Sequence, residues 1–420
     1  MDWADSPEQA AFRAKVRAFF EDNLPQRYRE DLGPLRPHMI RASNGEEILA
    51  THAEWGTDRY SEDPEVKGAA DDWAKALADE GYVASSWPKH LGGAGFTTIE
   101  QFIFNEERER AGAPRVGGSG AMFLGSLLMV YGTEEQKARY MPAIARGEID
   151  WAQGYSEPGS GSDLASLQCR AVRDGDEYVV NGQKLWSQPL TSDAMYTLVR
   201  TDPEAPKHRG ISFLMIEDLN DPGITMAQLP SMAFHYPGNG ETFFHDVRVP
   251  VANLIGEENQ GWYVAMTLMD FDRGSLSDTG EDRENLDHLF DFLQTAEGRR
   301  VSRVGRLPSV RAEIADRFIE ARVGQNLAQR VASMQAAGLI PNYEASIGKC
   351  FSTELHQRLA RTGTKTFGLY SNLWPGDERA PLHGQHTHDY ARTVAFTIYG
   401  GSSEIQRNVI ATRGLGLPRG

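Results

Sequence analysis

Hydrophobic positions recur at helical spacing through the first part of the chain. Ser6 and Gln9 form a capping box, with proline at the first helical position, and apolar side chains then fall on one helical face: Phe12, Val16, Phe19 and Phe20. A second helix is predicted from Thr133 and should end near Met141-Pro142. Residues 1–150 are therefore interpreted as a helical domain.

The pattern changes to short apolar runs between residues 151 and 260. Asp174-Gly175 and Asn181-Gly182 are dipeptides typical of tight hairpins. Strands are predicted over residues 177–180, 184–186, 194–201, 210–216, 224–229 and 242–249. Because no helix of normal length fits between these runs, the segment is interpreted as a domain of antiparallel sheet.

Helical spacing returns over residues 261–420. One long helix is indicated by Val310, Ile314, Phe318, Ala321, Leu327, Val331 and Met334, and it should break at Gly338 and Pro341. A further helix is expected over residues 343–367. Residues 370–388 are predicted to form a loop, and a last helix should follow Ser402-Ser403.

Composition narrows the function classes. The 420 residues are 40% hydrophobic and 24% charged, which is typical of a globular protein with more than one packed region. A net charge of −16 argues against nucleic-acid binding, since phosphate recognition needs clustered Lys and Arg. The chain has no apolar run of membrane-spanning length, and its first residues do not resemble a secretory signal.

The metal-ligating residue types show no site pattern. Cys169 and Cys350 lie far apart, without metal spacing, and are interpreted as free thiols of a cytoplasmic protein. His383, His386 and His388 also lack regular metal spacing, and their segment is expected at the surface. We therefore predict no metal.

Five short motifs follow one another in a specific order. They are YGTEEQK at residues 131–137, YSEPGSGSD at 155–163, DGDEY at 174–178, NGQKLW at 181–186 and IYGGSSEIQRN at 398–408. Together they resemble the acyl-CoA dehydrogenase family, over nearly the whole chain. The resemblance implies an α+β multidomain fold with an N-terminal helical domain, a central antiparallel β-domain and a C-terminal four-helix bundle. It also implies a dimer or tetramer.

The resemblance further implies the reaction. Enzymes of this family use FAD to remove hydrogens from the α and β carbons of an acyl-CoA thioester, giving the trans-2-enoyl-CoA, and pass the electrons to an electron-transfer flavoprotein. The pattern resembles a bacterial branch that acts on long or bulky acyl groups, including steroid side chains. Such chemistry needs a flavin as hydride acceptor, hydrogen-bond donors for the thioester oxygen and a carboxylate for the α-proton.

By resemblance, the flavin-contacting positions come from three motifs. They are Tyr155, Ser156, Gly161, Ser162, Trp186, Ser187, Gln188, Ser402 and Glu404. Ser162 also matches a position that binds the pantetheine arm of coenzyme A. Where the family often has Thr-Ser or Ile-Thr after the tryptophan, this chain has Ser187-Gln188, and Gln188 is a substitute hydrogen-bond donor. The alternative, taken residue by residue, is that the serines cap turns and Trp186 belongs to the core.

The catalytic base is the position at which the chain departs most from the family. One branch carries a glutamate where this chain has Gly400, whose backbone N–H is still able to bind the thioester oxygen. Another branch carries the glutamate before an arginine on a helix after the β-domain, which makes Asp272 the candidate base. Asp270 and Arg273 match positions near the coenzyme A nucleotide. The alternatives are that Asp272 is a weak base, a vestige, or a surface carboxylate paired with Arg273.

Two other functions stay open at this point. Some bacterial relatives form heterotetramers of paralogous subunits, one of which lacks the base or the flavin site, and Asp272, Gly400 and Gln188 make that role plausible. An acyl-CoA oxidase or a nitroalkane oxidase is the third possibility.

Overall fold

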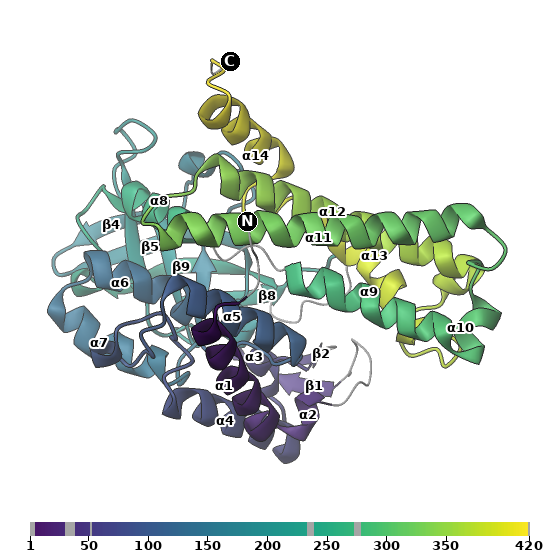
Figure 1. The fold of residues 1–420 in the computed structure, drawn as a ribbon. Helices are drawn as coiled ribbons and strands as arrows, with labels where there is room; N and C mark the ends of the chain where they lie inside the picture. Colours follow the sequence, from purple (N-terminus) through teal and green to yellow (C-terminus); the bar gives the residue numbers. More distant parts are fainter. Residues whose placement is uncertain (1–4, 30–37, 51–52, 233–238, 273–278, 419–420) are drawn as a thin grey trace.

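The computed structural model describes residues 5–29, 38–50, 53–232, 239–272 and 279–418. Figure 1 shows three regions: N-terminal helices, a β-domain beside them, and a bundle of long C-terminal helices that extends away from both. The expected fold class, helical regions around a central β-domain, is confirmed. Within the described residues, no helix combines the length and the apolarity that crossing a membrane requires.

The N-terminal region begins with the predicted capping box. Ser6 and Gln9 cap each other's backbone N–H groups, and helix α1 starts at the next residue, Pro7. The helices of this region are α1 (Pro7–Asn23), α2 (Gln26–Arg29), α3 (Trp55–Asp58), α4 (Pro64–Asp79), α5 (Thr98–Arg110), α6 (Gly125–Tyr131) and α7 (Glu134–Ala145).

One prediction for this region was wrong, and one element was not predicted. Helix α7 does not end at Pro142 but continues to Ala145, because Met141 and Ile144 are fully buried and their packing offsets the hydrogen bond that proline cannot make. The region also contains a hairpin of β1 (His38–Arg41) and β2 (Glu47–Ala50). Its apolar residues Ile40 and Ile48 pack into the core of the β-domain, so its stability depends on tertiary contacts.

The β-domain has a sheet of seven strands among the described residues. They are β3 (Trp151–Gly154), β4 (Arg170–Asp174), β5 (Glu177–Ser187), β6 (Ala194–Arg200), β7 (Ile211–Ile216), β8 (Ile224–Gln228) and β9 (Gly240–Pro250). The order is β3-β6-β4-β5-β9-β8, with β7 on β6. Most neighbours are antiparallel as predicted, but β6 pairs in parallel with β3 and β4, because the β4–β5 hairpin takes the place of a crossover helix.

Only one of the two predicted hairpin dipeptides makes a hairpin. Asp174-Gly175 joins β4 to β5 as expected. Asn181-Gly182 instead lies inside β5, where the register with β9 shifts. Gly182 has a φ of +146°, and a Cβ on it would lie 2.7 Å from the Cα of Cys169. The shift comes from an extra residue in β9, where His245 and Asp246 lie opposite Asn181, and Gly182 allows a close backbone approach rather than a turn.

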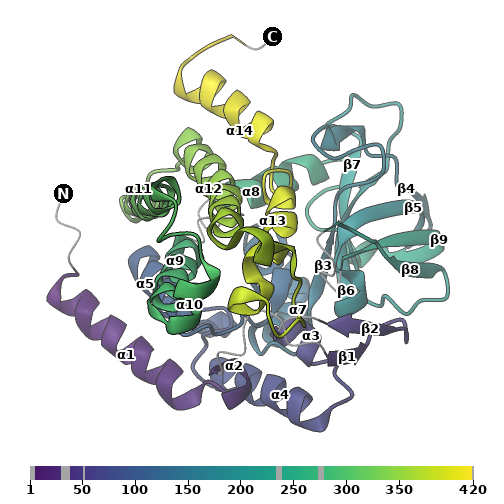
Figure 2. The same ribbon diagram turned by 90° about the vertical axis from the view of Figure 1, so that its right-hand side faces the viewer.

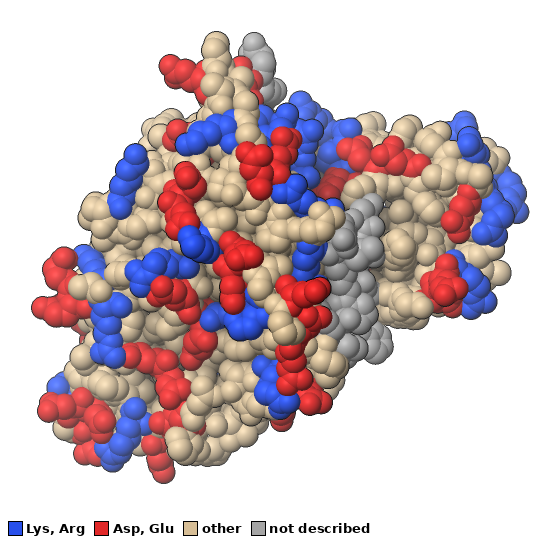
Figure 3. Space-filling view, turned by 90° about the horizontal axis from the view of Figure 1, so that it is seen from below, with Lys and Arg blue, Asp and Glu red and all other residues tan. Residues whose placement is uncertain are grey.

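The C-terminal region follows the predicted helices closely. Its helices are α8 (Gly261–Asp272), α9 (Thr279–Gln294), α10 (Ala296–Val301), α11 (Pro308–Ala336), α12 (Tyr343–Phe367), α13 (Gln385–Phe396) and α14 (Ser403–Val409). Helices α9, α11, α12 and α13 pack together as a bundle, and α14 projects from it (Figures 1 and 2). On the face shown in Figure 3, acidic and basic side chains are interspersed.

The histidines near residue 386 do not lie where the sequence predicted. Helix α13 starts at Gln385, inside the expected loop, and buries His386 and His388, while His383 is exposed. The ring of His386 lies 5.9 Å from that of Phe367, and Gly363 leaves room for it. The burial of its ring lowers the pKa of His386 from the ordinary value of 6.5. No group of three potential metal-ligating side chains occurs among the described residues.

We predict that His386 makes the protein acid-sensitive. A histidine whose pKa is lowered by folding contributes stability above its unfolded pKa, and that stability is lost as the pH falls below about 6.5. The free energy of unfolding should fall by up to about 1.4 kcal/mol per pH unit in that range. Urea unfolding between pH 8 and pH 5 should show a shallower slope for His386→Gln. The exposed control, His383→Gln, should keep the wild-type slope, and equal slopes in all three proteins would rule out His386.

Candidate active site

A buried ion pair holds the glycine-rich turn of residues 155–163 against strand β5. Oε1 of Glu157 lies 2.8 Å from Nζ of Lys184, and both side chains are almost completely buried. The Glu157 carboxylate also accepts backbone N–H bonds from Gln168, at 2.6 Å, and Cys169, at 2.9 Å. Lys184 donates a second bond to the carbonyl of Tyr155, at 3.2 Å. The pair thus joins the turn, β5 and the segment before β4.

The turn is also bonded directly to the strand that carries Trp186. The N–H of Leu185 donates to the carbonyl of Ser156 over 2.8 Å. Trp186 follows in the left-handed region, with a φ of 60°, between Leu185 and Ser187 where the register shifts a second time. Such a conformation is strained for a bulky residue and is often found at binding sites.

The Trp186 ring is not part of the core. Its exposed fraction is 58%, although a large aromatic surface gains free energy when it is covered. The ring is therefore available to a flat ligand. This observation contradicts the alternative that Trp186 is a core residue.

The surroundings of Trp186 fit a flavin. Gly159 and Gly161 have no atom within 4 Å of an added Cβ, so the turn leaves open space along its backbone. The Ser187 hydroxyl is buried and makes no hydrogen bond within the described residues. Ser156 is half-buried, and Ser162 and Gln188 are exposed. An exposed aromatic plane, an open backbone and free hydroxyl groups suit a planar ring with polar edges.

The last motif forms a turn between α13 and α14. Gly400 and Gly401 both have positive φ, 62° and 85°, which glycine adopts without strain. The Ser402 hydroxyl accepts the N–H of Ile405 over 3.4 Å and so caps α14, and it also hydrogen-bonds the Glu404 carboxylate. Glu404 is exposed in the first turn of α14. Ser402 is therefore a cap, as the alternative held.

Helix α8 carries the predicted base. Val264 and Ala265 are buried in the core with Phe213, and the Thr267 hydroxyl lies 2.8 Å from that of Tyr131. These contacts anchor the first turns of the helix on the β-domain and on α6. Asp270 and Asp272 belong to the helical end of α8, but their side chains, and Arg273 altogether, lie outside the described residues. The roles of these three residues stay predictions.

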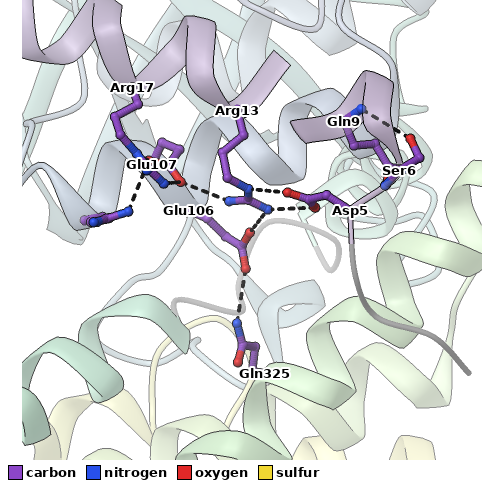
Figure 4. A network of polar contacts seen from close by, with 9 residues as sticks. Asp5, Ser6, Gln9, Arg13, Arg17, Glu106, Glu107 and Gln325 are labelled. Atoms are coloured by element: carbon purple, nitrogen blue, oxygen red, sulfur yellow. Dashed lines mark hydrogen bonds and ion pairs between the residues drawn. The ribbon is translucent and has the colours of Figure 1, made fainter. Parts of the chain in front are cut away.

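A separate cleft of about 750 Å³ lies between α1 and α5 on one side and α9 and α11 on the other. Figure 4 shows the polar network that joins its two sides. Arg13 bonds to Asp5 and Glu106, at 2.6 and 2.9 Å, and Gln325 of α11 donates to Glu106. Among the described side chains, no site residue predicted from the sequence lines the cleft. Its charged walls of both signs, paired with each other, do not resemble a flavin site.

Comparison with known proteins decides the family. Models of the N-terminal, middle and C-terminal domains of acyl-CoA dehydrogenases match residues 37–148, 152–247 and 259–415. The chain is 33% identical to acyl-CoA dehydrogenase FadE26 of Mycobacterium tuberculosis over 99% of its own length and 98% of that protein. The chain belongs to the acyl-CoA dehydrogenase family. It is thus a member of a flavoprotein family of oxidoreductases that act on the CH–CH bond of acyl-CoA.

Two solved structures resemble this acyl-CoA dehydrogenase family member over its full length. The ChsE4-ChsE5 complex from Mycobacterium tuberculosis is 32% identical, with a TM-score of 0.81. The Tcur3481-Tcur3483 steroid ACAD is 30% identical, with a TM-score of 0.82. In both cases the similarity covers 100% of this chain and of the other.

Sequence reasoning on this family member missed Glu157 and Lys184 as the residues that hold the site together. The sequence contained a signal, because Lys184 falls on the same alternate positions of β5 as the buried Val180. A charged side chain at a buried position of a strand needs a buried partner. Glu157, inside the glycine-rich motif, is that partner.

We predict that Lys184→Met destabilises the protein strongly. Removing one partner of a buried ion pair leaves an uncompensated charge and costs about 3–5 kcal/mol, whereas an exposed pair contributes under about 1 kcal/mol. Lys207→Met is the matched control, because Lys207 forms an exposed pair with Asp163 of the same turn, at 2.7 Å. Urea unfolding at pH 7 measures both losses. Similar losses for the two variants would contradict the inference that the Glu157–Lys184 pair holds the turn. Adding Glu157→Gln to Lys184→Met should restore part of the stability.

Proposed function

We propose that this protein is an FAD-dependent acyl-CoA dehydrogenase that converts an acyl-CoA to the trans-2-enoyl-CoA and passes the electrons to an electron-transfer flavoprotein. The observation that carries the proposal is that Trp186 is exposed, with a left-handed backbone conformation, beside the glycine-rich turn that the Glu157–Lys184 pair holds. A core residue would not be exposed in this way, and a surface loop would not need a buried ion pair beneath it.

The flavin would be held by residues of three motifs. FAD supplies the hydride acceptor when it is bound. Trp186 would cover one part of the ring and exclude water, while the backbone around Tyr155 and Gly161 and the hydroxyls of Ser156 and Ser187 would bind its polar edge. Gln188 would donate where the family has a hydroxyl. Ser402 and Glu404 would contact the sugar and phosphate portion.

The substrate groups would be bound around the thioester. The Gly400 N–H would donate to the thioester oxygen, where charge develops as the α-proton leaves. Asp272 would take that proton. Ser162 would bind the pantetheine arm, and Asp270 and Arg273 the nucleotide end of coenzyme A.

The acyl group is proposed to be bulky, of the steroid side-chain class. Support comes from the likeness to the Tcur3481-Tcur3483 steroid ACAD and from the match to both of these solved complexes over their whole length. The two complexes are named as pairs of different proteins, so a heterotetramer with a paralogous subunit is a natural assembly beside a homodimer or homotetramer.

The surface of the C-terminal region also favours an assembly. Four large apolar side chains near the turn at Gly400 and after α14 have exposed fractions above one half: Ile398, Tyr399, Leu415 and Leu417. Exposed apolar surface of this kind commonly marks a subunit interface. A second candidate function follows, in which the chain is a base-deficient partner subunit, and it is favoured by Gly400 and by the aspartate at position 272.

We predict that the purified protein is yellow and holds about one FAD per subunit, because Trp186, the glycine-rich turn and the Ser402 turn are all present in this chain. Flavin absorbance of the protein expressed alone, and mixed with its paralogous subunit, measures this. Flavin that appears only in the mixed complex would favour the partner-subunit function. A colourless protein in both preparations would refute the flavin site.

We predict that Asp272→Asn loses the ability to bleach the flavin. A general base contributes about 10²–10⁴-fold to the rate, and the amide cannot take the α-proton. Anaerobic bleaching by a panel of acyl-CoA thioesters measures the rate and the chain preference together. Asp272→Glu restores the side-chain length found in the family and should keep at least the wild-type rate.

Asp287→Asn is the control for this prediction. Asp287 is a carboxylate of α9 that pairs at the surface with Arg283, at 2.9 Å, so its removal should leave bleaching unchanged. Wild-type bleaching by Asp272→Asn, with FAD still bound, would exclude Asp272 as the base.

A further inference from the structure

One buried lysine touches the turn that carries Gly400. Lys349 of α12 has an exposed fraction of 4%, and its Nζ donates to the carbonyls of Phe396, at 3.0 Å, and Gly401, at 2.8 Å. The same ammonium lies 5.9 Å from the centre of the Tyr399 ring. Lys349 therefore spans the turn from the last residue of α13 to the residue before the cap of α14.

Two more polar side chains on α12 hold the segments on either side of the turn. Gln357 donates to the Thr393 carbonyl and the Thr397 hydroxyl, at 3.2 and 3.0 Å. Glu354 pairs with Arg407 of α14 at 2.7 Å. Lys349, Glu354 and Gln357 of α12 together contact the end of α13, the turn and the start of α14.

Burying the Lys349 ammonium costs free energy, which indicates that this lysine has a specific role. An ammonium removed from water needs strong partners, and the partners of Lys349 in the described contacts are carbonyl oxygens and an aromatic face rather than a carboxylate. Burial lowers its pKa to about 8. The Phe396 carbonyl is at the C-terminal end of α13, where a cation is favoured.

The turn needs such support because its backbone is unusually free. Gly400 and Gly401 are consecutive glycines in the left-handed region, and glycine has the largest conformational entropy to lose. The Gln406 side chain donates to the carbonyls of Gly400, at 3.1 Å, and Gly401, at 3.2 Å, and Lys349 donates to that of Gly401 over a shorter distance, 2.8 Å. These bonds fix the planes of both peptide groups that follow Gly400.

We propose that Lys349 is a positioning residue for the reaction. By holding the Phe396 and Gly401 carbonyls, it keeps the Gly400 N–H directed at the thioester oxygen and the Ser402 cap directed at the cofactor. The inference rests on the proposed function, because it assigns the turn to substrate and flavin. A preorganised donor acts without reorganisation during the reaction, and its loss lowers the turnover number more than substrate binding.

The test compares variants of two lysines of the same helix in the complete protein. Lys349→Met removes the donor and keeps the apolar stem, and Lys349→Arg keeps a charged donor. Lys365→Met is the control, since Lys365 forms an exposed pair with Glu313 at 2.9 Å. We expect Lys349→Met to lower kcat for thioester-dependent flavin reduction about 100-fold. KM should change less than about 3-fold, Lys349→Arg should recover at least about tenfold, and Lys365→Met should stay within about twofold of wild type.

Amide hydrogen exchange of residues 397–406 gives a readout that needs no activity. Exchange should be at least about tenfold faster in Lys349→Met, an increase that corresponds to the local loss of one anchoring hydrogen bond or more. Exchange should be unchanged in Lys365→Met. Unchanged exchange, or an unchanged kcat, would overturn the inference. If the wild type neither binds FAD nor reduces it with any thioester, the proposed function fails, and faster exchange would then support the anchoring of the turn alone. Should Lys349→Met not fold, Lys349→Gln, which keeps one donor, takes its place.

Discussion

The burial of opposite charges at Glu157 and Lys184 is the interaction on which the rest of the site depends. Two ionised groups removed from water are tolerated only when their remaining hydrogen-bonding capacity is satisfied, and here backbone groups of the turn and of the segment before β4 contribute to it. The buried pair and the local backbone arrangement therefore depend on each other. The pair needs the turn, the strand β5 and the segment before β4 in one arrangement, and that arrangement leaves Trp186 exposed at the end of β5.

The second part of the site is built by the same principle from a different domain. Lys349 is buried against carbonyl groups, so the turn at Gly400 is held by a charge that cannot leave without losing its partners. The two glycine-rich turns thus obtain their geometry from buried lysines on regular elements, one on a strand and one on a helix. Flexible backbone can approach a ligand closely, and a rigid element supplies the order that glycine lacks.

Local signals predicted the elements, and tertiary contacts account for the failures. Capping residues placed the starts of α1 and α7 correctly, and the apolar spacing gave α11 and α12. Asn181-Gly182 failed as a hairpin because Cys169 lies against it, and His386 failed as a surface residue because Phe367 and Gly363 accommodate its ring. The family motifs indicated Ser156, Trp186 and Ser402. They contain Glu157 and Lys184 without indicating that the two form a buried pair, and they do not include Lys349, whose partners are backbone carbonyls that no residue pattern reveals.

The alternation of β5 around Gly182 gives the strand a particular sensitivity to chain length. Successive side chains of a strand point to opposite faces, and Val180 and Lys184 share the buried face, while Trp186 is the extra residue of β5 opposite β9. Deleting Gln183 would shift Lys184 by one position and turn its side chain away from Glu157. The spacing within this strand is therefore a stricter requirement than the identity of most residues in it, and insertions in related chains should be confined to the loops around it.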